Sequence, residues 1–344
     1  MIQNAEILGR HGVALSSATY ADSSPHAHDV YPAMKKENLG LLFGLLGVTV
    51  FAITLPMTRM ATGTADAPLL SPWFVTFGRA VLAGTLSVIV LLATRSPWPR
   101  TEHRAPLLMA VLGNALGFPI FLGFALRLVP SSHAAVFTAL LPLATAAAAA
   151  LVLGQRARLG FWLCAALGAG LVMVFSALRA NAQGHNLGLE WADALLLGAV
   201  LAAAMGYVYG AKVTPTLGAE RVICWVCVMA LPVTIPGALL TWPEQAIPAS
   251  AWIGLGYVGI FSMWAGFFAW FRGLAIGGAL RVSQVQLLQP FISIVAGFLI
   301  LGEGFEALTL GFAFAVVFTV FLGRRFTQPP APASPAAAAD SKPP

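Results

Sequence analysis

Runs of about 20 apolar residues, separated by short polar breaks, fill the chain between residues 39 and 323. A helix of about 20 apolar residues crosses the hydrocarbon core of a bilayer. The pattern therefore predicts an all-α integral membrane protein with ten transmembrane helices. They are expected at 39–57, 71–93, 105–127, 133–153, 159–178, 188–210, 222–241, 251–271, 281–301 and 305–323.

Two polar segments flank the predicted bundle. Residues 1–34 contain no apolar run long enough for a secretory signal, and residues 326–344 are rich in proline and alanine, so we expect this tail to be disordered. Met34 is followed by two lysines and then by the first apolar run. Two interpretations stay open: translation begins at Met34, or the first 34 residues form a polar cytoplasmic extension.

The composition supports a membrane location. Hydrophobic residues make up 58% of the chain and charged residues only 9%, whereas a soluble domain carries about 25% charged residues. The net charge is +6, but the chain has few charged residues in total, so no nucleic-acid surface is expected. Cys224 and Cys227 have the spacing of a ligand pair, but no second pair and no nearby histidine accompany them. They are interpreted as structural, and no metal or cofactor is expected.

The basic residues predict the orientation. With a cytoplasmic amino terminus, only Arg59, Arg127 and Arg179 of the basic residues flanking the spans fall outside. Because lysine and arginine accumulate in cytoplasmic loops, both termini are predicted to be cytoplasmic, in a multi-pass protein of the plasma membrane. The residues that this orientation places inside are Lys35, Lys36, Arg95, Arg100, Arg104, Arg156, Arg158, Lys212, Arg221, Arg272, Arg281, Arg324 and Arg325.

Two segments of the chain resemble each other. LLPLATAAAAALVLGQ at 140–155 aligns without gaps to LQPFISIVAGFLILGE at 288–303, and the shared Pro-to-Gly spacing carries the match. A repeat of five spans has an odd number of crossings, so the second copy must enter the membrane from the opposite side. Arg156 and Arg158 follow the first segment, whereas Glu303 and Glu306 end or follow the second, as expected if the two loops lie on opposite faces. The sequence thus predicts two inverted five-helix repeats, at 35–180 and 186–325.

These features lead to a family resemblance. The ten spans, the repeat, the segment ALRLVPSSHAAVFTALLPLATAAAAALVLGQ, its counterpart GALRVSQVQLLQPFISIVAGFLILGE and the phrase FGRAVLAGTL resemble the EamA-like branch of the drug/metabolite transporter superfamily. The resemblance covers residues 36–325, and Gln155 departs from the usual LGE, which the second copy keeps at Glu303. It implies a proton- or exchange-linked carrier of small polar metabolites, often an exporter, that works by alternating access between its halves.

Six residues within the spans are candidates for substrate binding. Arg79 is the charged residue placed inside a span, where an unpaired cation costs about 2.5–3.5 kcal/mol, and a substrate carboxylate or phosphate would be its natural partner. Asn114, Gln286 and Gln289 are costly in lipid and should face the bundle interior, where they either bind substrate or join helices by hydrogen bonds. Tyr207 and Trp264 could form an apolar wall of the site, or pack in the core or against lipid.

Other functions are less consistent with the sequence. A lipid-modifying enzyme needs a cluster of acids or a base beside a nucleophile, and the histidines and acids are scattered over tails, loops and span edges. An ATP-driven pump would need a glycine-rich nucleotide loop, which the chain lacks. A channel-like facilitator is the remaining alternative. The expected partners are a small-molecule substrate and the lipid bilayer, and the sequence leaves open whether the protein forms a homodimer.

The orientation can be tested by labelling. Single cysteines introduced in 94–104 should be protected from a membrane-impermeant thiol reagent added outside intact cells, and cysteines in 180–187 should react. The physical reason is the placement of basic loops inside. The reverse pattern would contradict both the orientation and the inverted-repeat argument.

Overall fold

A computed structural model describes residues 36–154, 158–182, 190–277 and 282–326. The segments 1–35 (with Met34) and 327–344 lie outside the described residues, and so do Gln155 and the whole loop at 183–189. Within the described part the chain is helical and contains no β-strand. The predicted all-α membrane fold is confirmed.

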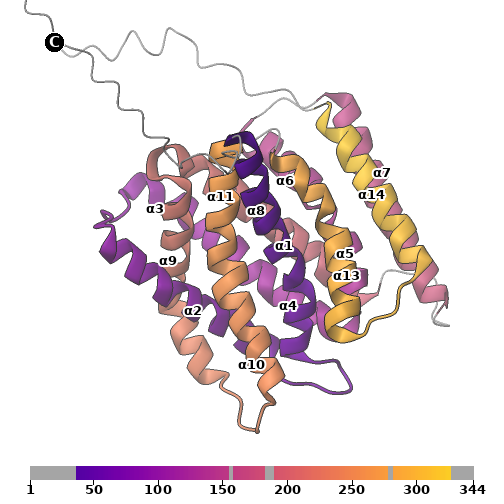
Figure 1. The fold of residues 1–344 in the computed structure, drawn as a ribbon, viewed down its shortest axis with the longest axis horizontal. Coiled ribbons are helices and arrows are strands. Elements are labelled where there is room, and N and C mark those ends of the chain that lie inside the picture. Colours follow the sequence, from indigo (N-terminus) through magenta and orange to yellow (C-terminus); the bar gives the residue numbers. More distant parts are fainter. Residues whose placement is uncertain (1–35, 155–157, 183–189, 278–281, 327–344) are drawn as a thin grey trace, which may run out of the picture. The chain divides into compact units, whose positions relative to one another are not determined.

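Within the described residues the helices form ten successive passes. The first five are α1 (Lys36–Thr62), α2 (Pro72–Ala93), α3 (Thr101–Ala110) continuing into α4 (Phe118–Leu128), α5 (Ser131–Thr138) continuing into α6 (Leu141–Val152), and α7 (Leu159–Ala182). The second five are α8 (Trp191–Leu217), α9 (Ala219–Leu240), α10 (Ala249–Gly256) continuing into α11 (Gly266–Gly277), α13 (Gln289–Leu301) and α14 (Ala307–Arg324). Figure 1 shows them packed together as one bundle of helices.

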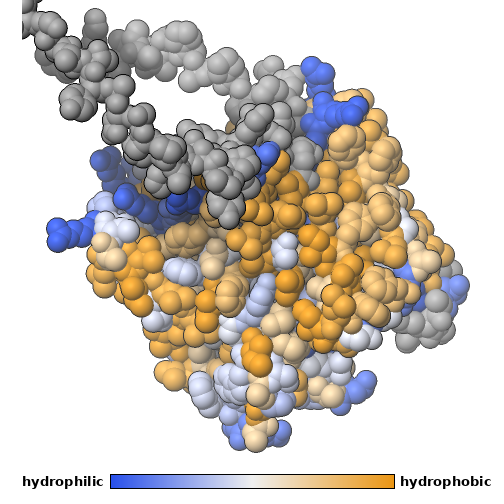
Figure 2. All heavy atoms as spheres, in the orientation of Figure 1, coloured by the Kyte–Doolittle hydropathy of each residue, from blue (hydrophilic) through white to orange (hydrophobic). Residues whose placement is uncertain are grey.

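Nine passes within the described residues are long and apolar enough to cross a membrane. The tenth, Val285–Leu301, is a shorter apolar helix. A band of hydrophobic side chains lies between hydrophilic residues at the two ends of the bundle (Figure 2). Several helices extend beyond the predicted apolar runs. Helix α1 continues to Thr62 and so includes Arg59, because a helical backbone need not stop where hydropathy falls.

The contacts between helices follow a two-fold pattern. Helix α1 packs along α11, and α8 packs along α4. The first passes of the two repeats are α1 and α8, and the third passes contain α4 and α11. Each first pass therefore packs against the third pass of the other repeat. Exchanging each pass for its counterpart five passes away also turns the α1–α13 contact into the α8–α6 contact, and it leaves the α2–α9 and α7–α14 pairs unchanged. Figure 1 shows α7 and α14 side by side at one edge. These pairs are the packing expected of two inverted repeats.

The fourth pass of each repeat is broken at the same place. Pro142 lies in the first turn of α6, after a break that follows α5, and Pro290 lies in the first turn of α13, after a short 3₁₀ segment at Ser283–Leu288. Proline lacks the N–H that a continuous helix requires, so it is tolerated at a helix start. Both passes then end at a glycine with positive φ, Gly154 at 64° and Gly302 at 67°, a conformation that favours glycine. The Pro-to-Gly match in the sequence is therefore also a structural match.

Close helix contact depends on glycine where α8 meets the segment between α3 and α4. A Cβ at Gly113 would overlap the backbone of Ala202 and Gly206 on α8. Backbone atoms cannot move aside as a flexible side chain can, so the two glycines set the separation of these passes.

Substitution of Gly113 by alanine should destabilise the protein by about 1–3 kcal/mol through overpacking. The measurement is the apparent Tm of the purified protein in detergent. Gly170→Ala is the matched control, because a Cβ at Gly170 would meet no atom within 4 Å. Equal Tm values for the two variants would contradict the proposed close contact.

Candidate functional site

Arg79 is buried on α2, with 3% of its surface exposed. Its Nη2 atom donates a hydrogen bond to the Ser262 hydroxyl at 3.3 Å, and Thr54 donates to the same hydroxyl at 2.7 Å. The Nε and Nη1 atoms make no hydrogen bond within the described residues. A guanidinium with two unused donors can bind a carboxylate or phosphate oxygen pair.

Arg79 lines a cavity between the two repeats. The cavity has three adjoining lobes that share Tyr207 as a lining residue. The arginine lobe contains Arg79 and has a volume of about 50 Å³, the glutamine lobe contains Gln286 and Gln289 and has about 380 Å³, and the aromatic lobe has about 600 Å³. Both repeats supply walls to each lobe. The cavity therefore lies where relative movement of the halves would change its shape.

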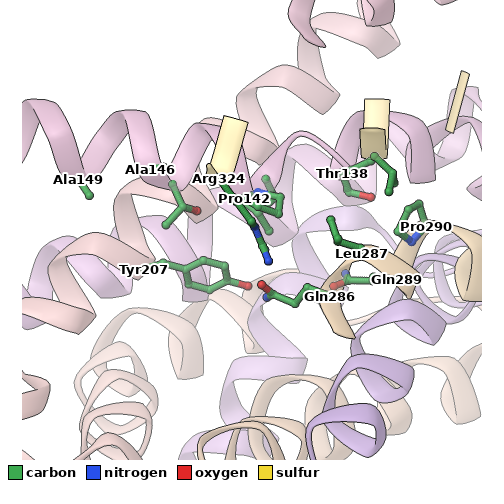
Figure 3. Close-up of a pocket in the computed structure, with 14 residues that line it drawn as sticks. Thr138, Pro142, Ala146, Ala149, Tyr207, Gln286, Leu287, Gln289, Pro290 and Arg324 are labelled. Atoms are coloured by element: carbon green, nitrogen blue, oxygen red, sulfur yellow. The ribbon is translucent and has the colours of Figure 1, made fainter. Parts of the chain in front are cut away.

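Five of the six candidate residues line this cavity. Asn114 borders the arginine and aromatic lobes, Gln289 the arginine and glutamine lobes, and Gln286 the glutamine and aromatic lobes. The Tyr207 hydroxyl and the two glutamine carboxamides point toward one another (Figure 3). The structure thus brings together residues from four passes that are far apart in sequence.

Trp264 lies elsewhere. Its ring packs against Phe268 with centroids 4.9 Å apart, and it contacts the buried cluster formed around α9. It borders none of the three lobes described above. Phe267, three residues later along the same pass, lines the arginine and aromatic lobes instead. Choosing between such neighbours requires the rotation of the helix, which apolar sequence does not specify.

The sequence also gave no indication of the hydroxyl pair beside Arg79. Thr54 and Ser262 are separated by 208 residues, and a hydroxyl in an apolar helix usually bonds to its own backbone. Arg324, which was assigned only to the orientation of the chain, lines the glutamine lobe. The available signal for these residues was a polar side chain within or at the end of a span, but many such side chains occur in the spans.

The cavity is electrostatically one-sided. Arg79 and Arg324 are the charged residues among the described side chains that line the three lobes, and no aspartate or glutamate is among them. The formal charges among the described lining side chains are therefore both positive.

The cavity walls reach one face of the bundle. Thr214, Ala219 and Leu274 line the aromatic lobe at the ends of α8, α9 and α11. Arg324, at the end of α14, lines the glutamine lobe at the same face. We call this the Arg324 face, and the other end of the bundle the Glu303 face.

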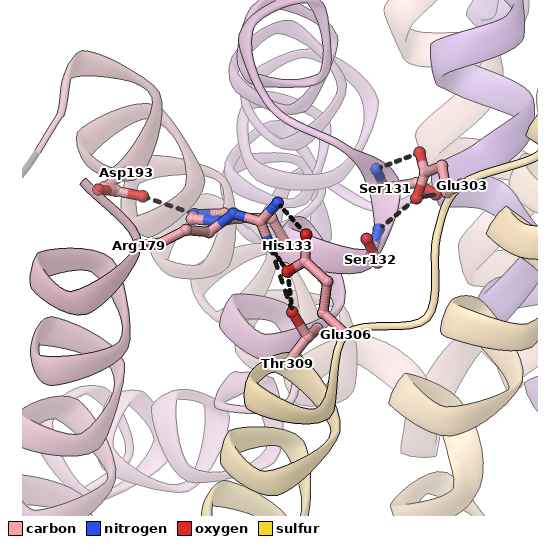
Figure 4. A network of polar contacts seen from close by, with 8 residues as sticks. All are labelled: Ser131, Ser132, His133, Arg179, Asp193, Glu303, Glu306 and Thr309. Atoms are coloured by element: carbon pink, nitrogen blue, oxygen red, sulfur yellow. Dashed lines mark hydrogen bonds and ion pairs between the residues drawn. The ribbon is translucent and has the colours of Figure 1, made fainter. Parts of the chain in front are cut away.

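Ionic contacts join the repeats at the Glu303 face. The Glu303 carboxylate accepts hydrogen bonds from the Ser131 and Ser132 amides at 2.7 and 2.9 Å and from the Ser131 hydroxyl at 3.0 Å (Figure 4). It also lies 3.6 Å from Arg59, whose Nη1 donates to the carbonyls of Leu126 and Val129. A carboxylate at the first amides of α5 is favoured by the helix dipole.

Two further pairs reinforce this face. Arg179 on α7 donates hydrogen bonds from Nη1 and Nη2 to the Glu306 carboxylate, at 2.5 and 3.0 Å, and Nη1 also donates to the Thr309 hydroxyl. His133 on α5 lies 2.8 Å from Asp193 on α8, and both side chains are buried (Figure 4). Neither residue was among the six candidates from the sequence. Each pair connects the first repeat to the second, so together they join the two halves at this face.

The family can now be stated from comparison with known proteins. The sequence model of the EamA-like transporter family matches residues 38–177 and 190–324, one segment in each repeat. The chain belongs to the EamA-like transporter family. It is 38% identical over 297 residues to the uncharacterized transporter YdeK of Bacillus subtilis (strain 168), covering 86% of this chain and all of that protein. The protein is thus a multi-pass membrane transporter, and the expectation that it is not an enzyme is confirmed.

A solved structure supports the fold. A crystal structure described only as that of a protein aligns with a TM-score of 0.54 and 20% sequence identity, over 84% of this chain and 99% of the other. At this identity the likeness concerns the fold alone.

Substitution of Glu303 by glutamine should weaken the Glu303 face. The amide removes the charge and can turn an N–H group toward the Ser131 and Ser132 amides, so we expect a loss of about 1–3 kcal/mol in stability and a lower apparent Tm. Glu102→Gln is the matched control, since Glu102 is exposed and lies 3.9 Å from the exposed Arg100. A Tm for Glu303→Gln equal to that of the control would contradict the role assigned to Glu303.

Proposed function

We propose that this transporter is a secondary carrier of a small organic anion, which binds Arg79 in the cavity between the two repeats. The observation that carries this proposal is a buried guanidinium with two unused donors, in a cavity whose described lining contains no acid. A carboxylate or phosphate would supply the missing counter-charge. Asn114, Gln286, Gln289 and the Tyr207 hydroxyl would supply neutral hydrogen bonds to the rest of a polar metabolite.

The energetic cost of Arg79 supports a binding role. A cation near the centre of a spanning helix costs about 2.5–3.5 kcal/mol on insertion scales, and one hydrogen bond to Ser262 offsets only part of that cost. A residue that served packing alone could be apolar at no such cost. A bidentate ion pair with substrate gives the charge a use that an apolar residue lacks.

The cavity walls indicate the remainder of the substrate. Phe51, Phe267 and Trp270 line the aromatic lobe, which is the largest. Such walls favour a ligand with an apolar or planar body beside its anionic group. We therefore propose amino-acid-like carboxylates and related compounds as the substrate class.

The arrangement of the two faces supports alternating access. The cavity walls reach the Arg324 face, while ionic pairs join the repeats at the Glu303 face. Discontinuous passes, here at Pro142 and Pro290, are common beside the substrate sites of inverted-repeat carriers. We propose that exchanging these two states moves the substrate, without ATP.

The basic loops suggest the direction of transport. The positive-inside rule assigns the Arg324 face to the cytoplasm, so the state described would load from inside the cell. We propose export across the plasma membrane, with both termini cytoplasmic.

Substitutions at Arg79 test the proposal. The substrate is first identified by comparing metabolites inside and outside cells with and without the protein. Arg79→Gln should abolish efflux of that substrate. Arg79→Lys keeps the charge but loses the planar fork, so it should retain only a small fraction of the efflux rate. Arg100→Gln, at an exposed arginine, should export normally.

The amount of protein in the membrane must be measured for each variant. A normal efflux rate in an Arg79→Gln variant that accumulates normally would overturn the proposal. A variant that fails to accumulate would indicate a structural role for Arg79.

A further inference from the structure

Arg324 is the second cation of the cavity, and it lies at the opposite end from Arg79. It is the last residue of α14 and is partly buried. Its guanidinium points into the glutamine lobe, toward the Tyr207 hydroxyl and Gln286 (Figure 3). Basic residues are common at helix ends, where they favour the dipole and reach solvent. The direction of this side chain is therefore informative.

Its neighbour Arg325 shows the ordinary arrangement. Arg325 is exposed, and its guanidinium lies 4.9 Å from the centre of the Phe321 ring. It borders none of the three lobes. Two adjacent arginines thus differ in position relative to the cavity, which provides a comparison within one helix end.

The two cationic ends of the cavity are continuous. The glutamine and arginine lobes share Thr138, Leu141, Tyr207 and Gln289 as lining residues. Between Arg324 and Arg79 the polar groups are therefore hydroxyls and carboxamides, and no acid lines either lobe in the described part of the chain. An anion could move along this path without meeting a like charge.

We propose that Arg324 forms a second oxyanion-binding position, at the Arg324 face, which binds the carboxylate or phosphate of the substrate before it reaches Arg79. This proposal rests on the anion-carrier function proposed above. Because Arg324 is closer to solvent, water screens its charge more strongly, and binding there is weaker and more readily reversed than at Arg79. Arg324 thus governs loading, whereas Arg79 governs the deeper bound state.

The experiment measures the potential of each lobe with charged thiol reagents, so the substrate need not be known. Cys164, Cys224 and Cys227 are replaced by alanine in the full chain, and a reporter cysteine replaces Ala146, which lines the glutamine lobe. In inside-out membrane vesicles, the rate of modification by anionic 2-sulfonatoethyl methanethiosulfonate is divided by the rate for its cationic trimethylammonium analogue. Neutral methyl methanethiosulfonate controls for accessibility.

Arg324→Gln should lower this anion-to-cation ratio at Ala146→Cys by at least about fivefold, because a unit charge nearby changes the two rates in opposite directions. Arg324→Lys should keep the ratio, and Arg325→Gln should leave it unchanged. An unchanged ratio in Arg324→Gln, or an equal fall in Arg325→Gln, would overturn the proposal.

Two further measurements cover the remaining outcomes. With Arg324 intact, the anion-to-cation ratio at Ala146→Cys should be at least about fivefold higher than the ratio for a free thiol in solution. Equal ratios would overturn the proposal. This measurement does not need the Arg324→Gln variant, so it applies even if that variant fails to accumulate in the membrane. A second reporter, Phe118→Cys, lines the arginine lobe and neither of the other two. If Arg79→Gln leaves the ratio there unchanged while Arg324→Gln lowers it at Ala146→Cys, the Arg79 site fails and the Arg324 site stands.

Discussion

A polar group inside a membrane must find its partner within the protein, since hydrocarbon offers none. The described arginines meet this constraint in different ways. Arg59 and Arg127 donate to backbone carbonyls near the ends of α1, α2 and α4, and Arg179 binds a carboxylate. Arg79 departs from this pattern, with one hydrogen bond and two unused nitrogens. Hydroxyls and carboxamides line the cavity beside these nitrogens, and the described lining residues include no acid.

The inverted repeat explains why the incomplete site lies between the halves. Each repeat breaks its fourth pass near a proline, which frees backbone groups that a continuous helix would use, and such groups are tolerated where they line a cavity. The breaks at Pro142 and Pro290 both border the glutamine lobe. The two copies differ in charge: the second ends at Glu303, whereas the first ends at Gln155. The symmetry of the backbone is therefore not a symmetry of electrostatics.

Much of this architecture could be read from the sequence, because the bilayer limits the possible structures. Apolar length determined the passes, and the Pro-to-Gly spacing revealed the repeat. Five candidates, Arg79 among them, line the cavity, since a polar side chain in a span has few places to point. The sequence could not supply what depends on helix rotation and long-range proximity. Helix rotation places Phe267, and not Trp264, at the cavity. The Thr54–Ser262 pair joins residues that are far apart in the sequence. Arg324 lies at a helix end, where contact with solvent was an equally simple expectation.

The Glu303 face has a kinetic consequence. Its carboxylate binds two amides and a hydroxyl of α5 in an arrangement largely shielded from water. Opening this face would require these donors and the carboxylate to become hydrated again within the same step. In a carrier that alternates between its two faces, this rehydration would add to the activation barrier for opening at the Glu303 face. The rate of turnover would then depend on releasing Glu303 from the start of α5, together with the Arg179–Glu306 and His133–Asp193 pairs, whichever substrate fills the cavity.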